Sequence, residues 1–181
     1  MDEKHVDLGK ATIRTYLGVS FNVLEPREED IHPLDIAKAL SQQCRFTGHT
    51  KPPYSVAEHS ILVATLSPTK WKLAALLHDA AEAYLMDLPT PIKNLPEMKP
   101  YRDMEDKLQR LIYKRFGVDS EEVPPSVKKA DHEAFKIEWN ALMVPTEDAW
   151  SLLKPHTWEE CATEFLKRLD LYSRELSSDA G

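Results

Sequence analysis

The sequence contains a series of helical patterns separated by short connections, many of which contain proline. This arrangement constrains the fold more than any other feature of the sequence. In "SVAEHSILVATL", Ser55 and Glu58 have the Ser-x-x-Glu spacing of a capping box, which predicts a helix with His59 in its second turn. Thr157 and Glu160 repeat that spacing before an apolar stripe that reaches residue 172. We therefore predict an all-α bundle of about six or seven helices with short connections.

The remaining helices are predicted from periodicity. "HPLDIAKALSQQCRF" places Pro33 in a first helical turn, and "RDMEDKLQRLIYKRF" is amphipathic and stops at Gly117. "TKWKLAALLHDAAEAYLM" predicts one continuous helix, and "SVKKADHEAFKIEWNALM" predicts another with Asp131 near its middle. Before residue 30, "IRTYLGVSFNVL" favours a short hairpin or an extended lead-in because it mixes β-branched and aromatic residues.

Composition limits the domain count, the partners and the compartment. A chain of 181 residues that is 42% hydrophobic is expected to form a single domain over residues 1–181. The net charge of −7 argues against a nucleic-acid polymer as partner, and no run reaches the roughly 18 apolar residues of a membrane span. Cys44 and Cys161 lack metal-site spacing and are too few for a disulfide scaffold, which favours a reducing, cytoplasmic location.

The stretch "LAALLHDAAEAYLMDLPTPIK" places polar groups in a run that is otherwise rich in alanine and leucine. If this stretch is a helix, Glu82 lies beside both His78 and Asp79, because residues three and four apart share a face. Buried carboxylates are unfavourable unless they are paired or bind a metal. Two interpretations stay open from these residues alone: a metal site, or a structural cluster in which the side chains cap one another or pair with a lysine.

The wider pattern resembles a known superfamily. His59, the His78-Asp79 pair and Asp131 form an H…HD…D pattern, which resembles the HD-domain phosphohydrolases. "YSVAEHS", "LLHDAAEAYLMDLPTPIK" and "VKKAD" are similar to segments of small bacterial 5′-deoxynucleotidases. The segment from "RTYLGVSF" to "SVAEHS" resembles small bacterial and phage HD proteins, among them the phage dATP triphosphohydrolases that accompany 2-aminoadenine genomes. The resemblance spans roughly residues 14–142, and a phage-encoded protein would work in the host cytoplasm.

This resemblance implies a catalytic metal centre. A mixed set of two imidazoles and two carboxylates suits a divalent transition metal such as Zn, Co or Mn. Glu82 matches the catalytic glutamate of the family, and Asp79 is expected to contribute to catalysis as a ligand. No histidine lies between Asp79 and Asp131, which favours one protein-ligated ion and leaves open a second ion that bridges to substrate. The predicted metal ligands are His59, His78, Asp79 and Asp131.

The resemblance also implies substrate contacts. Asp87 matches the family residue near the sugar 3′-hydroxyl, and Arg45 matches its substrate arginine. Lys93, in the loop after the metal helix, is a second candidate for phosphate oxygens, and Lys128 could join them.

Aromatic residues near Arg45 leave base recognition open. Phe46 stands where a tryptophan is usual, so it is a candidate base contact, as are Tyr54 and Tyr16. Each of these three could instead belong to the core. His156 is expected at a loop or cap position.

The expected activity is hydrolysis of a deoxynucleotide. The five glycines form neither a phosphate-binding loop nor a dinucleotide fingerprint, which excludes kinase and dehydrogenase chemistry of those types. We favour dATP as substrate. It would be hydrolysed to deoxyadenosine and tripolyphosphate, or its phosphates would be released one after another. The alternatives are a 5′-deoxyribonucleoside monophosphatase and a non-catalytic nucleotide-binding scaffold. We expect a homo-oligomer, with the aromatic C-terminal helix and "EDAWSLL" as candidate interfaces.

Overall fold

The protein is described here from a computed structural model, which covers residues 11–144, 153 and 156–179. These residues are mostly helical, and the predicted all-α class is confirmed. The short 3₁₀ and π segments are Glu28–Asp30, Arg45–Gly48, Thr69–Trp71, Pro96–Met98 and Trp139–Met143. The strands and α-helices are β1 (Thr12–Arg14), β2 (Ser20–Asn22), α1 (Pro33–Gln42), α2 (Val56–Leu66), α3 (Lys72–Leu76), α4 (Glu82–Leu85), α5 (Thr90–Lys93), α6 (Lys99–Arg115), α7 (Pro125–Glu138) and α8 (Trp158–Asp179).

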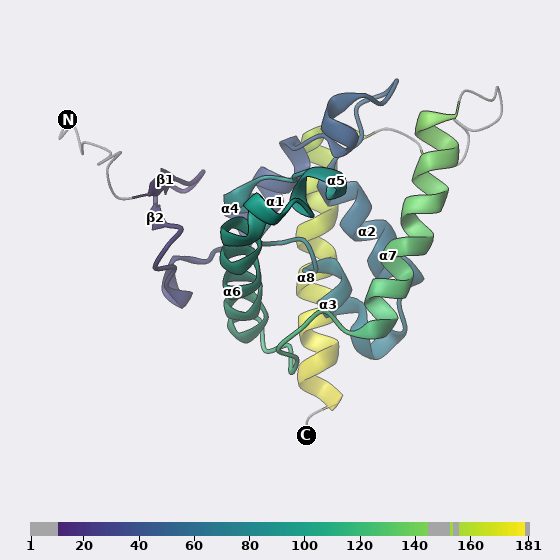
Figure 1. The fold of residues 1–181 in the computed structure, drawn as a ribbon. Helices are drawn as coiled ribbons and strands as arrows, with labels where there is room; N and C mark the ends of the chain where they lie inside the picture. The colour runs from purple at the N-terminus through teal and green to yellow at the C-terminus, as the bar shows by residue number, and fades with distance from the viewer. Residues whose placement is uncertain (1–10, 145–152, 154–155, 180–181) are drawn as a thin grey trace.

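The helices pack around the long C-terminal helix (Figure 1). Helices α1, α2 and α3 all contact α8, and α2 also packs against α3 and α7. The antiparallel hairpin of β1 and β2 lies at one edge of the bundle. Fully buried side chains from the hairpin and from most helices form one continuous core, including Phe21, Ile36, Leu76, Ile112 and Phe165.

The predicted helix boundaries agree with the structure where a local signal set them. The Ser55 side chain accepts from the Glu58 backbone N–H and the Glu58 side chain accepts from the Ser55 backbone N–H, so the capping box at the start of α2 is complete. Thr157 and Glu160 make the same reciprocal pair before α8. Gly117 follows α6 with a φ of +72°, a left-handed value that glycine adopts without strain.

The structure differs from prediction between Thr69 and Met86, where one helix was expected and a broken one is found. The side-chain amide of Gln109 on α6 lies between the backbone groups that an unbroken helix would pair. Its Nε2 donates to the Leu77 carbonyl at 2.7 Å, and its Oε1 accepts from the Ala81 N–H at 3.2 Å. An inserted side chain of this kind is a recognised cause of helix breaks. The turn that carries His78 therefore keeps its backbone groups hydrogen-bonded.

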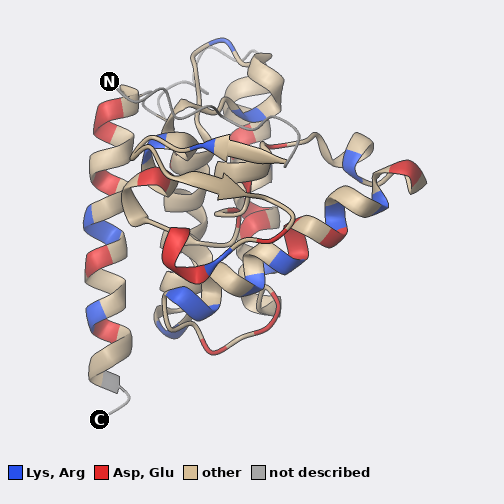
Figure 2. Ribbon diagram, turned by 90° about the vertical axis from the view of Figure 1, so that its left-hand side faces the viewer, with Lys and Arg blue, Asp and Glu red and all other residues tan. Residues whose placement is uncertain are grey.

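The outer surface is highly charged. Basic and acidic residues alternate along α8 (Figure 2). Among the residues described, no helix is both long and apolar enough to cross a membrane. Of the candidate interface "EDAWSLL", only Leu153 belongs to the described residues, so the rest of that segment lies outside them.

Candidate metal centre and substrate pocket

The four predicted metal ligands converge from three parts of the bundle. His59 comes from α2, Asp131 from α7, and His78 and Asp79 from the turn between α3 and α4. The His59 Nε2 atom lies 3.1 Å from Oδ1 of Asp131 and 3.5 Å from Oδ2 of Asp79. The His78 Nε2 atom lies 3.1 Å from Oδ2 of Asp79 and 3.9 Å from Oδ1 of Asp131. His59, His78 and Asp131 have ligand atoms within 4.8 Å of one another, and Asp79 lies beside both histidines. One ion could therefore bind at this point.

The other ring nitrogens show which histidine atoms are available to a metal. Nδ1 of His59 lies 2.7 Å from a Glu138 carboxylate oxygen, and Nδ1 of His78 lies 2.8 Å from the Ala75 carbonyl oxygen. Both partners can only accept when the carboxylate is ionised, so each Nδ1 carries the proton. In the neutral rings, both Nε2 atoms then point a lone pair at carboxylate oxygens. Both are buried, and neither makes a hydrogen bond of acceptable geometry within the described part of the chain. Such an arrangement needs either a second proton on a ring or a metal cation between these atoms, and its donor set fits a divalent transition metal.

The protonation states of the histidines and carboxyl groups in this centre depend on one another. Burial alone would lower the pKa of His78, but the neighbouring Asp79 and Asp131 raise it to about 9. Although burial opposes ionisation of both carboxyls, contact with the histidines holds the pKa values of Asp79 and Asp131 below their usual range. The centre therefore keeps its carboxylates ionised and retains a proton on His78 when no metal is bound.

Glu138 is a functional candidate that the sequence analysis missed. Its carboxylate is fully buried and accepts both from His59 Nδ1 and, at 3.0 Å, from an Arg45 guanidinium nitrogen. Despite burial, these two partners lower the pKa of Glu138. A carboxylate that orients a ligating histidine is a common feature of metal sites. Glu138 lies two helical turns after Asp131, and this shared helix face was the available signal.

Glu82 lies beside the centre and has one free oxygen. Its Oε1 accepts from the Lys93 ammonium at 3.1 Å, whereas its buried Oε2 has no hydrogen-bond partner among the described residues. Burial, followed by the charges of Asp79 and Asp87, raises the pKa of Glu82 well above its usual value. Lys93 also donates to Glu105 at 2.7 Å. Glu82 is thus a carboxyl group that holds a proton more readily than an ordinary glutamate does.

Gln43 is a second residue that the sequence analysis missed. Its side-chain amide donates to the Glu82 carbonyl at 2.9 Å and accepts from the Asp87 N–H at 3.1 Å. One amide therefore fixes the backbone of both the predicted catalytic residue and the predicted sugar contact. Nothing in the sequence pattern marks this role, since the two contacts are long-range.

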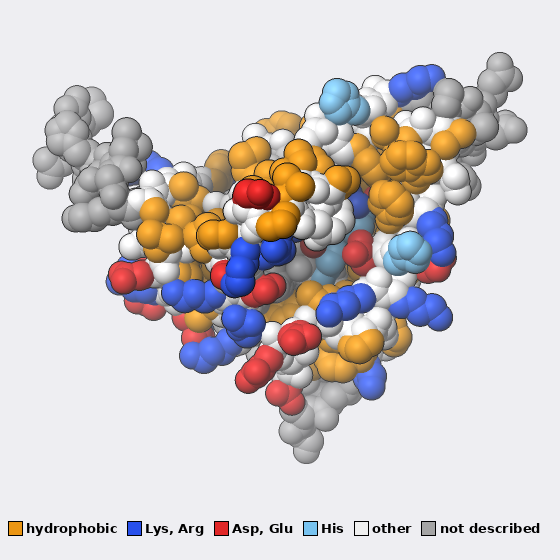
Figure 3. All heavy atoms as spheres, in the orientation of Figure 1, with side chains coloured by type: hydrophobic (Ala, Val, Ile, Leu, Met, Phe, Trp, Pro, Cys, Tyr) orange, Lys and Arg blue, Asp and Glu red, His pale blue; other side chains and the backbone are white. Residues whose placement is uncertain are grey.

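A pocket of about 830 Å³ opens next to the metal centre. Figure 3 shows the hollow in this face, with histidine and acidic side chains inside it and basic side chains around it. Its size is typical of pockets that hold small ligands. Lys128 lies at the rim with a 62% exposed side chain, and the Nε of Arg45 has no hydrogen-bond partner among the described residues. The lining includes five of the predicted substrate contacts: Arg45, Phe46, Asp87, Lys93 and Lys128.

One wall of this pocket is aromatic. Phe46, Phe135 and Trp139 lie with ring centroids 5.7 to 6.2 Å apart, and all three line the pocket. Phe135 and Trp139 come from α7 and the segment after it, and the sequence analysis did not single them out. Tyr54 is buried and Tyr16 is exposed, and neither is among the residues that line this pocket. Of the three predicted aromatic candidates, only Phe46 could therefore contact a ligand in this pocket.

Comparisons with known proteins identify relatives. No family model matches the chain. It is 37% identical over 142 residues to the uncharacterized protein YfdR of Escherichia coli, and the match covers 78% of each chain. It is 38% identical over 130 residues to the uncharacterized protein RCAP_rcc00048 of Rhodobacter capsulatus, covering 67% of this chain and 65% of that protein. At this identity and coverage, the chain belongs to the same protein family as YfdR.

Proposed function

We propose that this protein is a metal-dependent phosphohydrolase of the HD-domain type, and that it hydrolyses dATP to deoxyadenosine and tripolyphosphate, or to stepwise phosphates. One observation carries the proposal: the Nε2 atoms of His59 and His78 converge with two ionised carboxylates at the edge of a pocket of about 830 Å³. Such a mixed set of nitrogen and oxygen donors suits a divalent transition metal.

The residues of the centre would have two roles: four of them would bind the metal ion, and Glu82 would accept a proton. His59, His78, Asp79 and Asp131 would hold the ion. The ion would lower the pKa of a water molecule and offset phosphate charge. Glu82 would accept a proton from the attacking water, because it lines the pocket and its buried Oε2 has no hydrogen-bond partner among the described residues. Lys93 anchors the other oxygen of Glu82 and so orients the carboxylate.

Substrate recognition would use the rest of the pocket. The guanidinium group of Arg45 and the ammonium groups of Lys93 and Lys128 would bind phosphate oxygens. Asp87 would accept a hydrogen bond from the sugar 3′-hydroxyl, because Gln43 fixes its backbone and two prolines follow it in the loop. A 2′-hydroxyl beside that stiff loop would clash or lose its water partners, which favours deoxyribonucleotides.

The test is a substrate panel assayed with Mn²⁺ or Co²⁺ and after chelation. The panel contains the four deoxynucleoside triphosphates, ATP and the deoxynucleoside monophosphates, with products resolved by chromatography. We expect hydrolysis of dATP in preference to ATP, and loss of activity in protein shown to be metal-free by elemental analysis. Hydrolysis of monophosphates alone would replace this proposal by a 5′-deoxynucleotidase. Full activity of metal-free protein, or no turnover of any nucleotide, would reject the enzyme proposal.

A further inference from the structure

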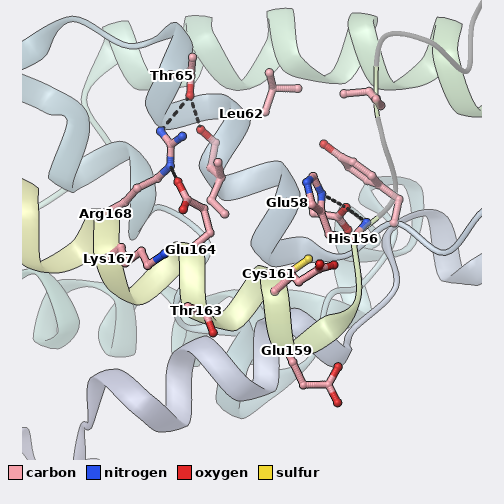
Figure 4. Close-up of a pocket in the computed structure, with 14 residues that line it drawn as sticks. Glu58, Leu62, Thr65, His156, Glu159, Cys161, Thr163, Glu164, Lys167 and Arg168 are labelled. Atoms are coloured by element: carbon pink, nitrogen blue, oxygen red, sulfur yellow. Dashed lines mark hydrogen bonds and ion pairs between the residues drawn. The ribbon is translucent and has the colours of Figure 1, made fainter.

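A second group of metal-ligating side chains lies in a different pocket. Glu58 comes from α2, Cys161 from α8, and His156 immediately precedes the Thr157 cap of α8. One potential ligand atom from each of these three lies within 4.8 Å of the other two. The His156 Nδ1 is 3.3 Å from Glu58 Oε1, and the Cys161 sulfur lies on the same side of the pocket (Figure 4).

Two capping boxes bring these residues together. Thr157 is the N-cap of α8. His156 is the residue just before this cap, and Cys161 is the fourth residue of the helix. Residues at those two positions normally pack against each other as an apolar pair. Here they are an imidazole and a thiol. Glu58, the third residue of α2, approaches them from the facing helix.

The Glu58 carboxylate is oriented as a metal ligand would be. Its Oε2 accepts from the backbone N–H of Ser55 at 2.7 Å and from the Ser55 hydroxyl at 2.8 Å. Its Oε1 accepts from the backbone N–H and faces Nδ1 of His156, both at the long distance of 3.3 Å. Ligating carboxylates are commonly fixed in this way through the oxygen that does not bind the metal. The side chain is buried, so the orientation is held firmly.

The donor set selects a class of metal. Thiolate, imidazole and carboxylate together suit Zn²⁺ and Co²⁺ and disfavour Mg²⁺ or Ca²⁺. Tetrahedral coordination at ordinary bond lengths needs ligand atoms on the order of 3.5 Å apart, which small side-chain movements would reach. A cavity of about 650 Å³ adjoins the three residues and has room for a water molecule as fourth ligand. We propose that Glu58, His156 and Cys161 form a second metal site, which binds a divalent ion of the zinc class and joins the start of α8 to the start of α2.

The experiment is Co²⁺ titration of the reduced full-length protein, followed by absorption spectroscopy. Cobalt bound to a thiolate gives an intense near-ultraviolet charge-transfer band. The centre at His59 and His78 contains no thiol, so it cannot produce this band. We expect one such band per chain, and we expect excess Zn²⁺ to remove it. The band should persist in His78→Ala, which separates this site from the proposed hydrolase centre.

Matched variants assign the ligands. Cys161→Ser should abolish the band, whereas Cys44→Ser should retain it, because Cys44 is the other, exposed cysteine. Circular dichroism checks that Cys161→Ser is folded. If it is not, His156→Ala tests the same site at a half-exposed side chain and should weaken Co²⁺ affinity at least tenfold. Absence of the band in the unmodified protein, its survival in Cys161→Ser, or unchanged affinity in His156→Ala would overturn the proposal.

Discussion

Nδ1 of His59 lies 2.7 Å from Oε1 of Glu138, and neither side chain is exposed to solvent. This contact fixes the tautomer of His59 and turns its Nε2 toward Asp131. Because Arg45 binds the other oxygen of Glu138, the same carboxylate also links the metal centre to a proposed phosphate contact.

The first prediction concerns this contact. Glu138→Gln should lower metal affinity by about 10- to 100-fold, the range found when groups behind a ligating histidine are changed. Calorimetric titration with Mn²⁺ would measure it. Glu133→Gln is the matched control, because Glu133 lies on the same helix and pairs with Lys136 at the surface. Equal affinities of Glu138→Gln and the unmodified protein would assign Glu138 to packing alone.

The second prediction separates metal binding from catalysis. Glu82→Gln should retain the metal and lose on the order of 10²-fold or more in kcat, because it removes a positioned proton acceptor. Glu105→Gln is the control, since Glu105 shares Lys93 with Glu82 but does not line the pocket. Nucleotide turnover and metal content are measured for both variants. Near-normal turnover in Glu82→Gln would leave that residue a structural role only.

The third prediction is a pH dependence of the metal-free protein. The pKa of His78 is raised from about 6.5 to about 9 by Asp79 and Asp131 against the effect of burial. Because His78 binds its proton more tightly in the folded state than in the unfolded state, this proton stabilises the fold fully below pH 6.5. The stabilisation is lost as the pH rises through about 9, where folded His78 loses the proton. Since a metal needs the neutral imidazole, metal affinity should increase over the same interval. The melting temperature of the metal-free protein is measured from pH 6 to 10 and compared with that of His78→Gln. If the two proteins show the same dependence of melting temperature on pH, the raised pKa does not belong to His78.

The fourth prediction tests the aromatic wall. Trp139→Ala should raise KM for dATP on the order of tenfold and change kcat less, because stacking on a base contributes about 1–3 kcal/mol. Trp158→Ala is the control, since Trp158 is exposed to a similar degree but lies outside this pocket. Identical KM values for the two variants would remove Trp139 from substrate binding.

The fifth prediction concerns the broken helix. Gln109→Ala leaves the buried Ala81 N–H without its partner and removes one of two donors to the Leu77 carbonyl, which should lower the free energy of unfolding by about 1–3 kcal/mol. It should also weaken metal binding, because the turn between these residues carries two of the proposed ligands. Gln42→Ala, at an exposed amide that donates to the Lys38 carbonyl of its own helix, should change neither quantity. Chemical denaturation and metal titration measure both effects.

Local signals explain how much of this molecule could be predicted. Capping boxes at Ser55 and Thr157 and the glycine after α6 each act within one helical turn, so they set boundaries correctly. The predicted metal ligands and pocket residues also meet in space. Gln43, Gln109 and Glu138 act across distances of tens of residues, and the sequence holds no periodicity that reports such contacts. For this reason the prediction of one continuous helix between Thr69 and Met86 was wrong.

His78 and Asp79 are adjacent in the chain, yet both side chains face one point. In a regular α-helix successive side chains diverge by about 100°, so neighbours cannot converge in this way. The geometry of the pair is thus a property of the turn, and the turn depends on an amide supplied by α6. A protein engineer who grafted the dipeptide onto a straight helix of another scaffold would not rebuild the centre. The graft would have to bring its supporting glutamine with it.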